Sequence, residues 1–200
     1  MSQRGWFLVF EGIDGCGKST QARRVGDARG ALMTFEPGDT EAGRALRAIV
    51  LDESLPMTPI AELLVMAADR AQHVHELIEP TLAAGRDVVC DRYSGSTLAY
   101  QGFGREVELE SIRRVLAVAT GGLEPDLTIL LDCPVEVAAE RRGRANGDRF
   151  EGEAGDFLGR VRNGFLELAA ASPHWVVVDA TASLELVSAA VDDAIGRLAP

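Results

Sequence analysis

A glycine-rich segment near the amino terminus has the residue types and spacing of a phosphate-binding loop. The segment GIDGCGKS, residues 12–19, fits the pattern G-x-x-x-x-G-K-[ST] and stands between an apolar run and a helical segment, the context that the pattern requires. In such a loop, backbone N–H groups and the N-terminus of the next helix face phosphate oxygens. A glycine-rich turn with an ordinary lysine is the weaker alternative. The residues expected to bind a nucleoside triphosphate are Gly12, Ile13, Asp14, Gly15, Cys16, Gly17, Lys18, Ser19 and Thr20.

Four positions of this loop indicate specific chemistry. Lys18 is expected to reach the β and γ phosphates, and Ser19 to supply a hydroxyl ligand to Mg²⁺. A carboxylate among phosphates is electrostatically costly, so Asp14 faces either a sugar hydroxyl or a metal-bound water, or else it is a solvated loop acid. Gly15 leaves the loop without an arginine. A cation for the transferring phosphoryl group must therefore come from elsewhere in the chain.

A second set of polar residues follows another apolar run. Asp91 is suited to hold the magnesium shell and Arg92 to grip a second phosphate in a bidentate manner, the alternative being a surface Asp-Arg pair. Arg70, in an apolar helical segment, either pairs with an acid such as Glu36 or contacts a ligand. Hydrogen-bonding groups that could read a nucleobase edge, or could instead cap a helix, come from Ser96, Thr97, Tyr100 and Gln101.

Short apolar runs precede the candidate site residues and predict buried parallel strands. Longer segments with helical periodicity, such as residues 59–84, alternate with the runs. The alternation predicts an α/β fold in which helices cover both faces of a five-stranded parallel sheet, within a single domain spanning residues 1–200. Ligands of such sheets bind beyond the carboxyl ends of the strands. The predicted strands are Trp6 to Phe10, Ala31 to Phe35, Asp87 to Cys90, Leu127 to Asp132 and Trp175 to Asp179.

Composition excludes several classes of function. Two hundred residues with 46% apolar content suffice for one sizeable core. The net charge of −11 argues against binding to nucleic acid or to an anionic membrane, because the average field repels polyanions. Cys16, Cys90 and Cys133 lack CxxC spacing and are expected to be reduced thiols. No stretch approaches the roughly 20 apolar residues of a membrane span, so we expect a soluble cytoplasmic protein.

An arginine-rich segment stands out in this acidic chain. The stretch ERRGRANGDRFE, residues 140–151, contains a glycine and an Asn-Gly pair that favour a mobile flap over a continuous helix. This flap, or lid, is expected at about residues 141–152. Alternatively, its arginines end a solvated helix and pair with neighbouring glutamates. The candidates to stabilise the transferring phosphoryl group are Arg141, Arg144 and Arg149.

The chain resembles the thymidylate kinase (dTMP kinase) family in several motifs that occur in order. The resemblance covers nearly the whole chain and is more specific than the phosphate loop alone. It implies a P-loop NTPase fold with a mobile lid, a homodimer, and Mg²⁺-dependent transfer of the ATP γ-phosphoryl group to dTMP, giving dTDP and ADP for dTTP synthesis. The motifs are FEGIDGCGKSTQ (10–21), EPG (36–38), AADRAQH (67–73), DRYSGSTLAYQG (91–102), PDLTILLD (125–132) and DRFE (148–151).

The resemblance also implies roles for single residues. By position, Arg92 would hold the dTMP phosphate and Arg70 the thymine edge. Ser96 and Thr97 would contact the base, whereas Tyr100 together with the loop aspartate would lie on the deoxyribose side. The full set expected to bind the acceptor is Asp14, Glu36, Met66, Arg70, Arg92, Ser96, Thr97, Tyr100 and Gln101.

Two departures from the family pattern leave base selectivity open. Phe35 stands where the family commonly has an arginine before Glu-Pro-Gly, and we expect it to be a core residue. Met66 stands where a phenylalanine usually packs against the thymine ring. Because methionine can pack on a ring through its sulfur, we expect weaker stacking rather than a lost pocket.

Two alternative functions remain at this point. One is a P-loop kinase for another acceptor, such as dUMP or a deoxynucleoside, although paired arginines favour an acceptor that already carries phosphate. The other is a nucleotide-dependent switch protein, but the chain has no N-K-x-D motif for reading guanine.

Overall fold

A five-stranded parallel sheet forms the centre of the computed structural model, which describes residues 4–143 and 155–198. The strands follow the order β2-β3-β1-β4-β5, and every neighbouring pair is parallel. The predicted α/β class is thus confirmed, and each predicted strand is found with bounds shifted by no more than about one residue. The strands are β1 (Phe7–Glu11), β2 (Leu32–Phe35), β3 (Val88–Asp91), β4 (Leu127–Asp132) and β5 (Trp175–Asp179).

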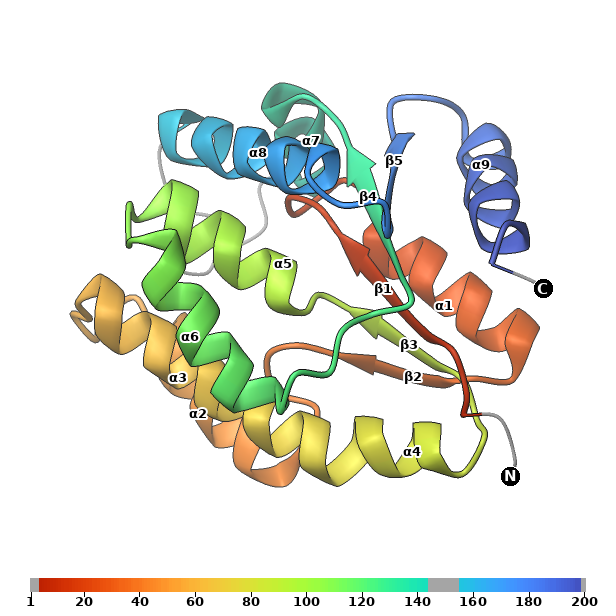
Figure 1. Ribbon diagram of the computed structural model, residues 1–200. Helices are drawn as coiled ribbons and strands as arrows, with labels where there is room; N and C mark the ends of the chain where they lie inside the picture. Colours follow the sequence, from red (N-terminus) through yellow and green to blue (C-terminus); the bar gives the residue numbers. More distant parts are fainter. Residues whose placement is uncertain (1–3, 144–154, 199–200) are drawn as a thin grey trace.

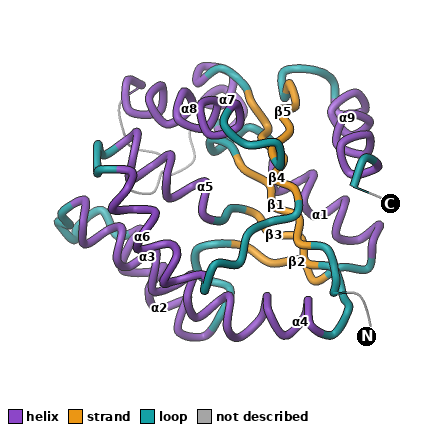
Figure 2. The backbone as a smooth tube through the Cα atoms, viewed as in Figure 1, coloured by secondary structure: helices purple, strands orange, loops and turns teal. Residues whose placement is uncertain are grey.

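Helices cover both faces of this sheet (Figure 1). In Figure 2, α1 and α9 lie on one side of the strands and α5 and α8 lie on the other. Two segments, η1 and η2, are π-helical and continue the helices before them. The bounds are α1 (Lys18–Arg29), α2 (Glu41–Leu51), α3 (Pro59–His73), η1 (Val74–Ile78), α4 (Glu79–Ala83), α5 (Ser94–Thr97), η2 (Leu98–Gly104), α6 (Leu109–Thr120), α7 (Val135–Arg142), α8 (Gly155–Ala170) and α9 (Leu184–Gly196).

The central strand explains why this sheet is apolar on both faces. All five residues of β1 are buried, and successive side chains of a strand point to opposite faces. Phe7 and Val9 pack among residues of η1 and α4, whereas Leu8 and Phe10 belong to the larger cluster that includes Ala22 of α1. Covering both faces leaves the carboxyl edge of the sheet as the place where polar side chains can gather.

The structure differs from the prediction at the start of the expected flap. Arg141 and Arg142 are the last residues of α7, and the helix ends at Gly143, whose φ of 68° lies in the region that favours glycine. The first two residues of the flap expected at about 141–152 are thus helical, and the flap itself remains a prediction. Arg144 and Arg149 lie outside the described residues.

No helix within the described residues is a candidate to span a membrane. None of them combines the length and the apolar content that crossing a bilayer would require.

Candidate functional site

The phosphate loop runs from the end of β1 into the first turn of α1. Gly12 has φ 140°, and a Cβ there would lie 2.5 Å from the Leu131 carbonyl oxygen. Gly17 precedes the helix with φ 95°, so glycine is required at both positions. Within the described residues no side chain caps the first N–H groups of α1. These donors are therefore available to an anion at the helix N-terminus.

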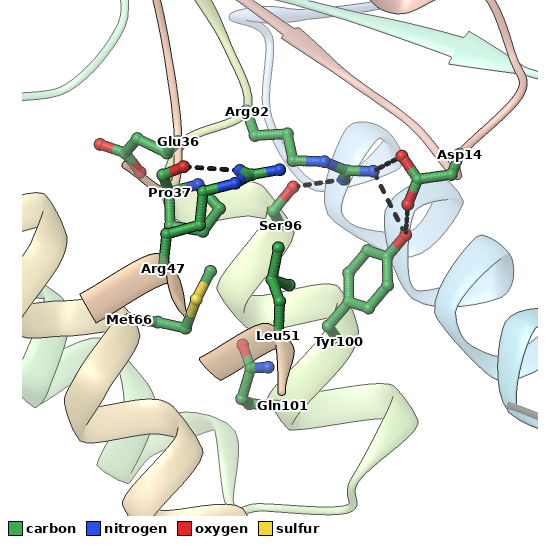
Figure 3. A pocket seen from close by; sticks show the side chains of 10 residues that line it. All are labelled: Asp14, Glu36, Pro37, Arg47, Leu51, Met66, Arg92, Ser96, Tyr100 and Gln101. Carbon is green, nitrogen blue, oxygen red and sulfur yellow. Dashed lines mark hydrogen bonds and ion pairs between the residues drawn. The ribbon is translucent and has the colours of Figure 1, made fainter. Parts of the chain in front are cut away.

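Two cations meet at the Asp14 carboxylate, as Figure 3 shows for Arg92. The Lys18 Nζ lies 2.9 Å from Asp14 Oδ1, and the Arg92 Nη2 lies 2.7 Å from the same oxygen. Burial alone would raise the pKa of Asp14, but the charges of Arg92 and Lys18 outweigh it and hold that pKa well below its usual range. The Tyr100 hydroxyl also donates to Asp14 Oδ2, at 3.4 Å. Asp14 is thus a bridging carboxylate rather than a solvated loop acid.

Ser19 and Asp91 lie side by side across the sheet edge. The Ser19 hydroxyl donates a short hydrogen bond to Asp91 Oδ2. The other oxygen, Asp91 Oδ1, is buried and has no hydrogen-bond partner among the described residues. A hydroxyl and a carboxylate with a free lone pair are the oxygen donors that Mg²⁺ accepts, directly or through water. The residues present therefore fit the magnesium site expected from the sequence.

The backbone at Arg92 is held in an unusual conformation. Its φ of 74° lies in the left-handed region, which costs a non-glycine residue about 1 kcal/mol. The Arg92 N–H donates to the Phe10 carbonyl at 2.9 Å, and its Nη1 donates to Ser96 Oγ at 2.9 Å. These contacts aim the guanidinium across the sheet edge toward Asp14, as expected for a group that grips a phosphate.

Glu11, for which we predicted no role, supports this turn through hydrogen bonds. Its carboxylate accepts hydrogen bonds from the Tyr93 N–H at 3.0 Å, the Ser96 N–H at 2.9 Å and the Ser96 hydroxyl at 2.6 Å. Burial raises the pKa of Glu11 to about 7, against the opposing effects of the Arg92 charge and these hydrogen bonds. The sequence contained one signal for this role, which is an acidic residue at the end of an otherwise apolar strand.

Arg70 pairs with Glu36, one of the two alternatives that the sequence left open, and its predicted contact with a ligand remains a prediction. Its Nε donates to Glu36 Oε2 at 2.8 Å, its Nη1 to Thr97 Oγ1 at 2.8 Å, and its Nη2 to the Tyr93 carbonyl at 2.9 Å. His73 Nδ1 lies 2.9 Å from the other Glu36 oxygen. Burial would raise the pKa of Glu36, but Arg70 and His73 lower it below its usual value. Arg70 and Thr97 have no exposed surface.

A hollow beside Arg92 gathers most of the residues predicted to bind the acceptor. We call it the first hollow (Figure 3). Met66 reaches it from α3, and consecutive residues of the π-helical η2, Tyr100 and Gln101, reach it from the other side. A π-helical segment is often found at a functional site. The residues lining the first hollow are Asp14, Glu36, Pro37, Arg47, Leu51, Met66, Arg92, Ser96, Tyr100 and Gln101.

A second hollow adjoins the first and contains Lys18, Ser19 and Asp91. Four residues line both hollows, so two anionic ligands could meet between them. These four are Asp14, Glu36, Arg47 and Arg92.

Phe35 lines the second hollow, and the expectation that it is a core residue is wrong. It is 39% exposed because β2 is the edge strand of the sheet and ends at this hollow. The Arg47 guanidinium lies over the Phe35 ring, 5.9 Å from its centroid, and its Nη1 donates to the Pro37 carbonyl at 2.6 Å. Sequence reasoning missed Arg47, because nothing in the pattern of α2 singles out this arginine.

A third hollow lies on the other side of the phosphate loop. Its walls include Cys16, Gly17 and Thr20 of the loop and α1, and Ala180 and Ala182 after β5. Arg141 Nη1 donates to the Ala180 carbonyl at 2.8 Å and so belongs to this hollow.

Comparison with known proteins gives a consistent result. A family model described as thymidylate kinase matches residues 10–191. The chain is 49% identical to a thymidylate kinase of Prochlorococcus marinus (strain MIT 9313) over 201 residues, which cover 94% of this chain and 92% of that protein. It is 45% identical to a thymidylate kinase of Geobacter sulfurreducens over 210 residues, which cover 98% and 99%.

A solved structure supports the same assignment. The crystal structure of thymidylate kinase from Ehrlichia chaffeensis matches with a TM-score of 0.77 and 28% sequence identity, covering 96% of this chain and 99% of that chain. With a P-loop sheet, two adjoining hollows and these relatives, the chain belongs to the thymidylate kinase family.

Proposed function

We propose that this chain, acting as a single kinase domain, transfers the γ-phosphoryl group of ATP to dTMP and releases dTDP and ADP. The observation that carries the proposal is the meeting of Lys18 and Arg92 at one carboxylate, Asp14, between two adjoining hollows. Phosphoryl transfer depends mainly on in-line placement of two anionic substrates and on neutralisation of their charge. A site with one cation for each phosphate suits that requirement.

On the donor side, the phosphate loop and Lys18 bind the ATP phosphates. The third hollow, next to the loop, is where we place the adenine, and Arg141 lies at its wall. Ser19 and Asp91 are the proposed holders of Mg²⁺, since Asp91 Oδ1 is buried without a partner among the described residues. When bound, the ion neutralises charge shared by the terminal phosphates.

On the acceptor side, the first hollow takes dTMP. Arg92 grips its phosphate, Asp14 and Tyr100 contact the deoxyribose side, and Met66 packs against the base. The roles predicted for Arg70 and Thr97 at the base remain predictions, because both side chains are fully buried behind the hollow. Arg70 supports the hollow through Glu36, which lines it.

The transferring phosphoryl group needs a further cation, because Gly15 leaves the loop without an arginine. Arg149, with Arg141 or Arg144, is proposed for that role. Arg141 is bonded to the Ala180 carbonyl in the third hollow, so we favour Arg149 and Arg144. Both lie outside the described residues.

A homodimer in the cytoplasm is the proposed working form. All three cysteines are buried free thiols, as expected for a reducing compartment. Partly exposed apolar side chains gather along α2, α3 and their connection, and such patches are typical of protein interfaces. These side chains are Ile49, Leu55, Ile60 and Leu64.

An assay of ADP release tests the reaction and its acceptor together. Purified protein with ATP and Mg²⁺ is given dTMP, dUMP, thymidine or no acceptor. We expect dTMP to give the fastest release and thymidine almost none, because Arg92 needs a phosphate to grip. Faster release with thymidine would favour a nucleoside kinase. ADP formation without acceptor, unaltered by dTMP, would reject the kinase reading in favour of a switch protein.

A further inference from the structure

The side-chain amide of Gln101 is held on one side only. Its Nε2 donates to Glu62 Oε1 at 2.9 Å. Its Oε1 is buried and has no hydrogen-bond partner among the described residues, although the residue lines the first hollow. In Figure 3 this amide lies below Met66, with its oxygen on the Met66 side. A buried acceptor left unpaired costs free energy until a donor reaches it.

Glu62 determines which end of the amide faces the hollow. An ionised carboxylate can only accept hydrogen bonds, so it can face the Gln101 NH₂ group but not the Gln101 oxygen. Glu62 is 2% exposed, and Arg105 holds it through contacts of 3.3 Å to each carboxylate oxygen. The acceptor end of Gln101 is therefore turned away from Glu62, which is buried and paired with the partly exposed Arg105.

The position of Glu62 on α3 explains how it reaches Gln101. Glu62 and Met66 are four residues apart and so lie on one face of the helix. Met66 lines the first hollow, while Glu62, one turn earlier, stands behind the η2 segment that carries Gln101. One helix face thus supplies both a contact for the ring and the group that orients the amide.

We infer that Glu62 is a positioning residue for base selection, which fixes the Gln101 amide so that the first hollow accepts a base with an N–H donor on its ring edge. This inference rests on the proposed function. Thymine and uracil carry such a donor at N3, whereas the N3 of cytosine is an acceptor. A base with an acceptor there leaves two buried acceptors facing each other, and a site built around a hydrogen bond rejects such a ligand strongly.

The central test replaces Glu62 by Gln and measures kinetics with dTMP and dCMP. A glutamine can present either its N–H or its oxygen, so the Gln101 amide becomes free to turn. We expect the ratio of kcat/KM for dTMP over dCMP to fall about 10- to 100-fold. The change should appear mainly in the KM for dTMP, with kcat and the KM for ATP nearly unchanged. A ratio equal to that of the wild type would overturn the inference.

Glu76→Gln is the matched control. Glu76 also accepts a hydrogen bond from a glutamine side chain, Gln72 Nε2 at 2.7 Å, but this pair is exposed on the surface. The same chemical change there should leave the base ratio unaltered. A fall in the ratio equal to that of Glu62→Gln would show that position 62 has no special role.

A double-mutant cycle with Gln101→Ala separates positioning from general damage. If Glu62 acts through Gln101, Glu62→Gln should change the base ratio little once Gln101 is absent. An equal further loss in the double variant would contradict the inference. Should Glu62→Gln fail to fold, Gln101→Ala still decides, because an unchanged base ratio in that variant would overturn the inference. Failure of the proposed function is distinct, since the wild type would then not phosphorylate dTMP at all.

Discussion

At the scale of single residues, this site depends on charges that are held in place before any substrate binds. Lys18 and Arg92 share Asp14, and Glu11 supports the turn that aims Arg92. Such preorganisation lowers the cost of orienting the groups during the reaction. The one charge not accounted for is the cation for the transferring group, for which Arg149 is proposed.

Replacing Arg149 by Ala should cut turnover much more than nucleotide affinity. An arginine aimed at a transferring phosphoryl group contributes about 10³ to 10⁵ in rate in related enzymes. Steady-state kcat, together with the ATP dissociation constant from calorimetry, would measure the two effects separately. Arg24→Ala is the control, since Arg24 pairs with Asp192 on the surface. An Arg149→Ala variant with normal turnover would remove this residue from the mechanism.

Replacing Glu11 by Gln should change how stability depends on pH. Burial raises the pKa of Glu11 from 4.5 to about 7, so over that interval the folded protein keeps a proton that the unfolded chain has released. The stability contributed by this group is fully present below about pH 4.5 and is lost as the pH rises through 7. A glutamine cannot ionise. Between these limits the unfolding free energy of the variant should gain about 3 kcal/mol relative to the wild type.

Urea unfolding across this pH range provides the measurement. Arg92 is the charge that most opposes the shift, followed by the hydrogen bonds from Ser96 and Tyr93, and these three residues are unchanged in the variant. Glu53→Gln, at an exposed position, is the control for loss of a carboxyl. Curves for wild type and Glu11→Gln that stay parallel would show that Glu11 ionises normally in the folded protein.

At the scale of elements, the start of α2 is packed against the loop that carries Glu36. Thr40 caps the helix by accepting from the Gly43 N–H at 2.9 Å, and Asp69 of α3 accepts from the Gly38 N–H at 3.0 Å. A Cβ at Gly43 would lie 2.5 Å from an Asp69 oxygen and 2.8 Å from the Thr40 hydroxyl. The helix start and the loop are therefore fixed to α3 by close contact.

Two glycine-to-alanine changes test this packing against intrinsic helix propensity. Alanine in a helix interior is favoured over glycine by about 1 kcal/mol. Gly159→Ala in α8 should stabilise the fold by about that amount, since no described atom beyond its chain neighbours and its own helix backbone lies within 4 Å of the added carbon. Gly43→Ala should instead lower the melting temperature, because the added carbon displaces the cap and Asp69. Thermal unfolding of both variants decides the point, and stabilisation by Gly43→Ala would contradict the packing argument.

At the scale of the whole molecule, the proposed interface and the first hollow share the helices α2 and α3. The three hollows line the carboxyl edge of the sheet, and the partly exposed apolar side chains lie along α2, α3 and their connection. Because α3 also carries Met66 and Glu62, a contact between subunits there would stiffen the helix that forms the wall of the first hollow.

Replacing Leu64 by Glu should convert the proposed dimer to a monomer. Leu64 is 53% exposed on α3, and a buried charge at an interface is costly. Light scattering after size-exclusion chromatography would give the mass. Leu186→Glu on α9, where the side chain is 65% exposed, is the control and should leave the mass unchanged. A Leu64→Glu protein with the wild-type mass would exclude α3 from the interface.

The parts that the sequence predicted are those determined by local pattern. Apolar runs located all five strands, and the glycine pattern located the loop with Lys18 and Ser19. Contacts between distant segments were not predictable: Glu62 reaches Gln101 across 39 positions, and Glu11 reaches Ser96 across 85. Phe35 was misjudged because its exposure depends on β2 being an edge strand, and a list of strands does not contain their order.

The left-handed backbone at Arg92 sets stability and activity against each other. Glycine would remove the strain at this position, and asparagine would reduce it, but either would take away the guanidinium between the hollows. Laboratory evolution for heat resistance alone would therefore favour replacing this arginine. Selection for kinase activity would instead retain the arginine, so the residue found at position 92 should differ between the two kinds of selection.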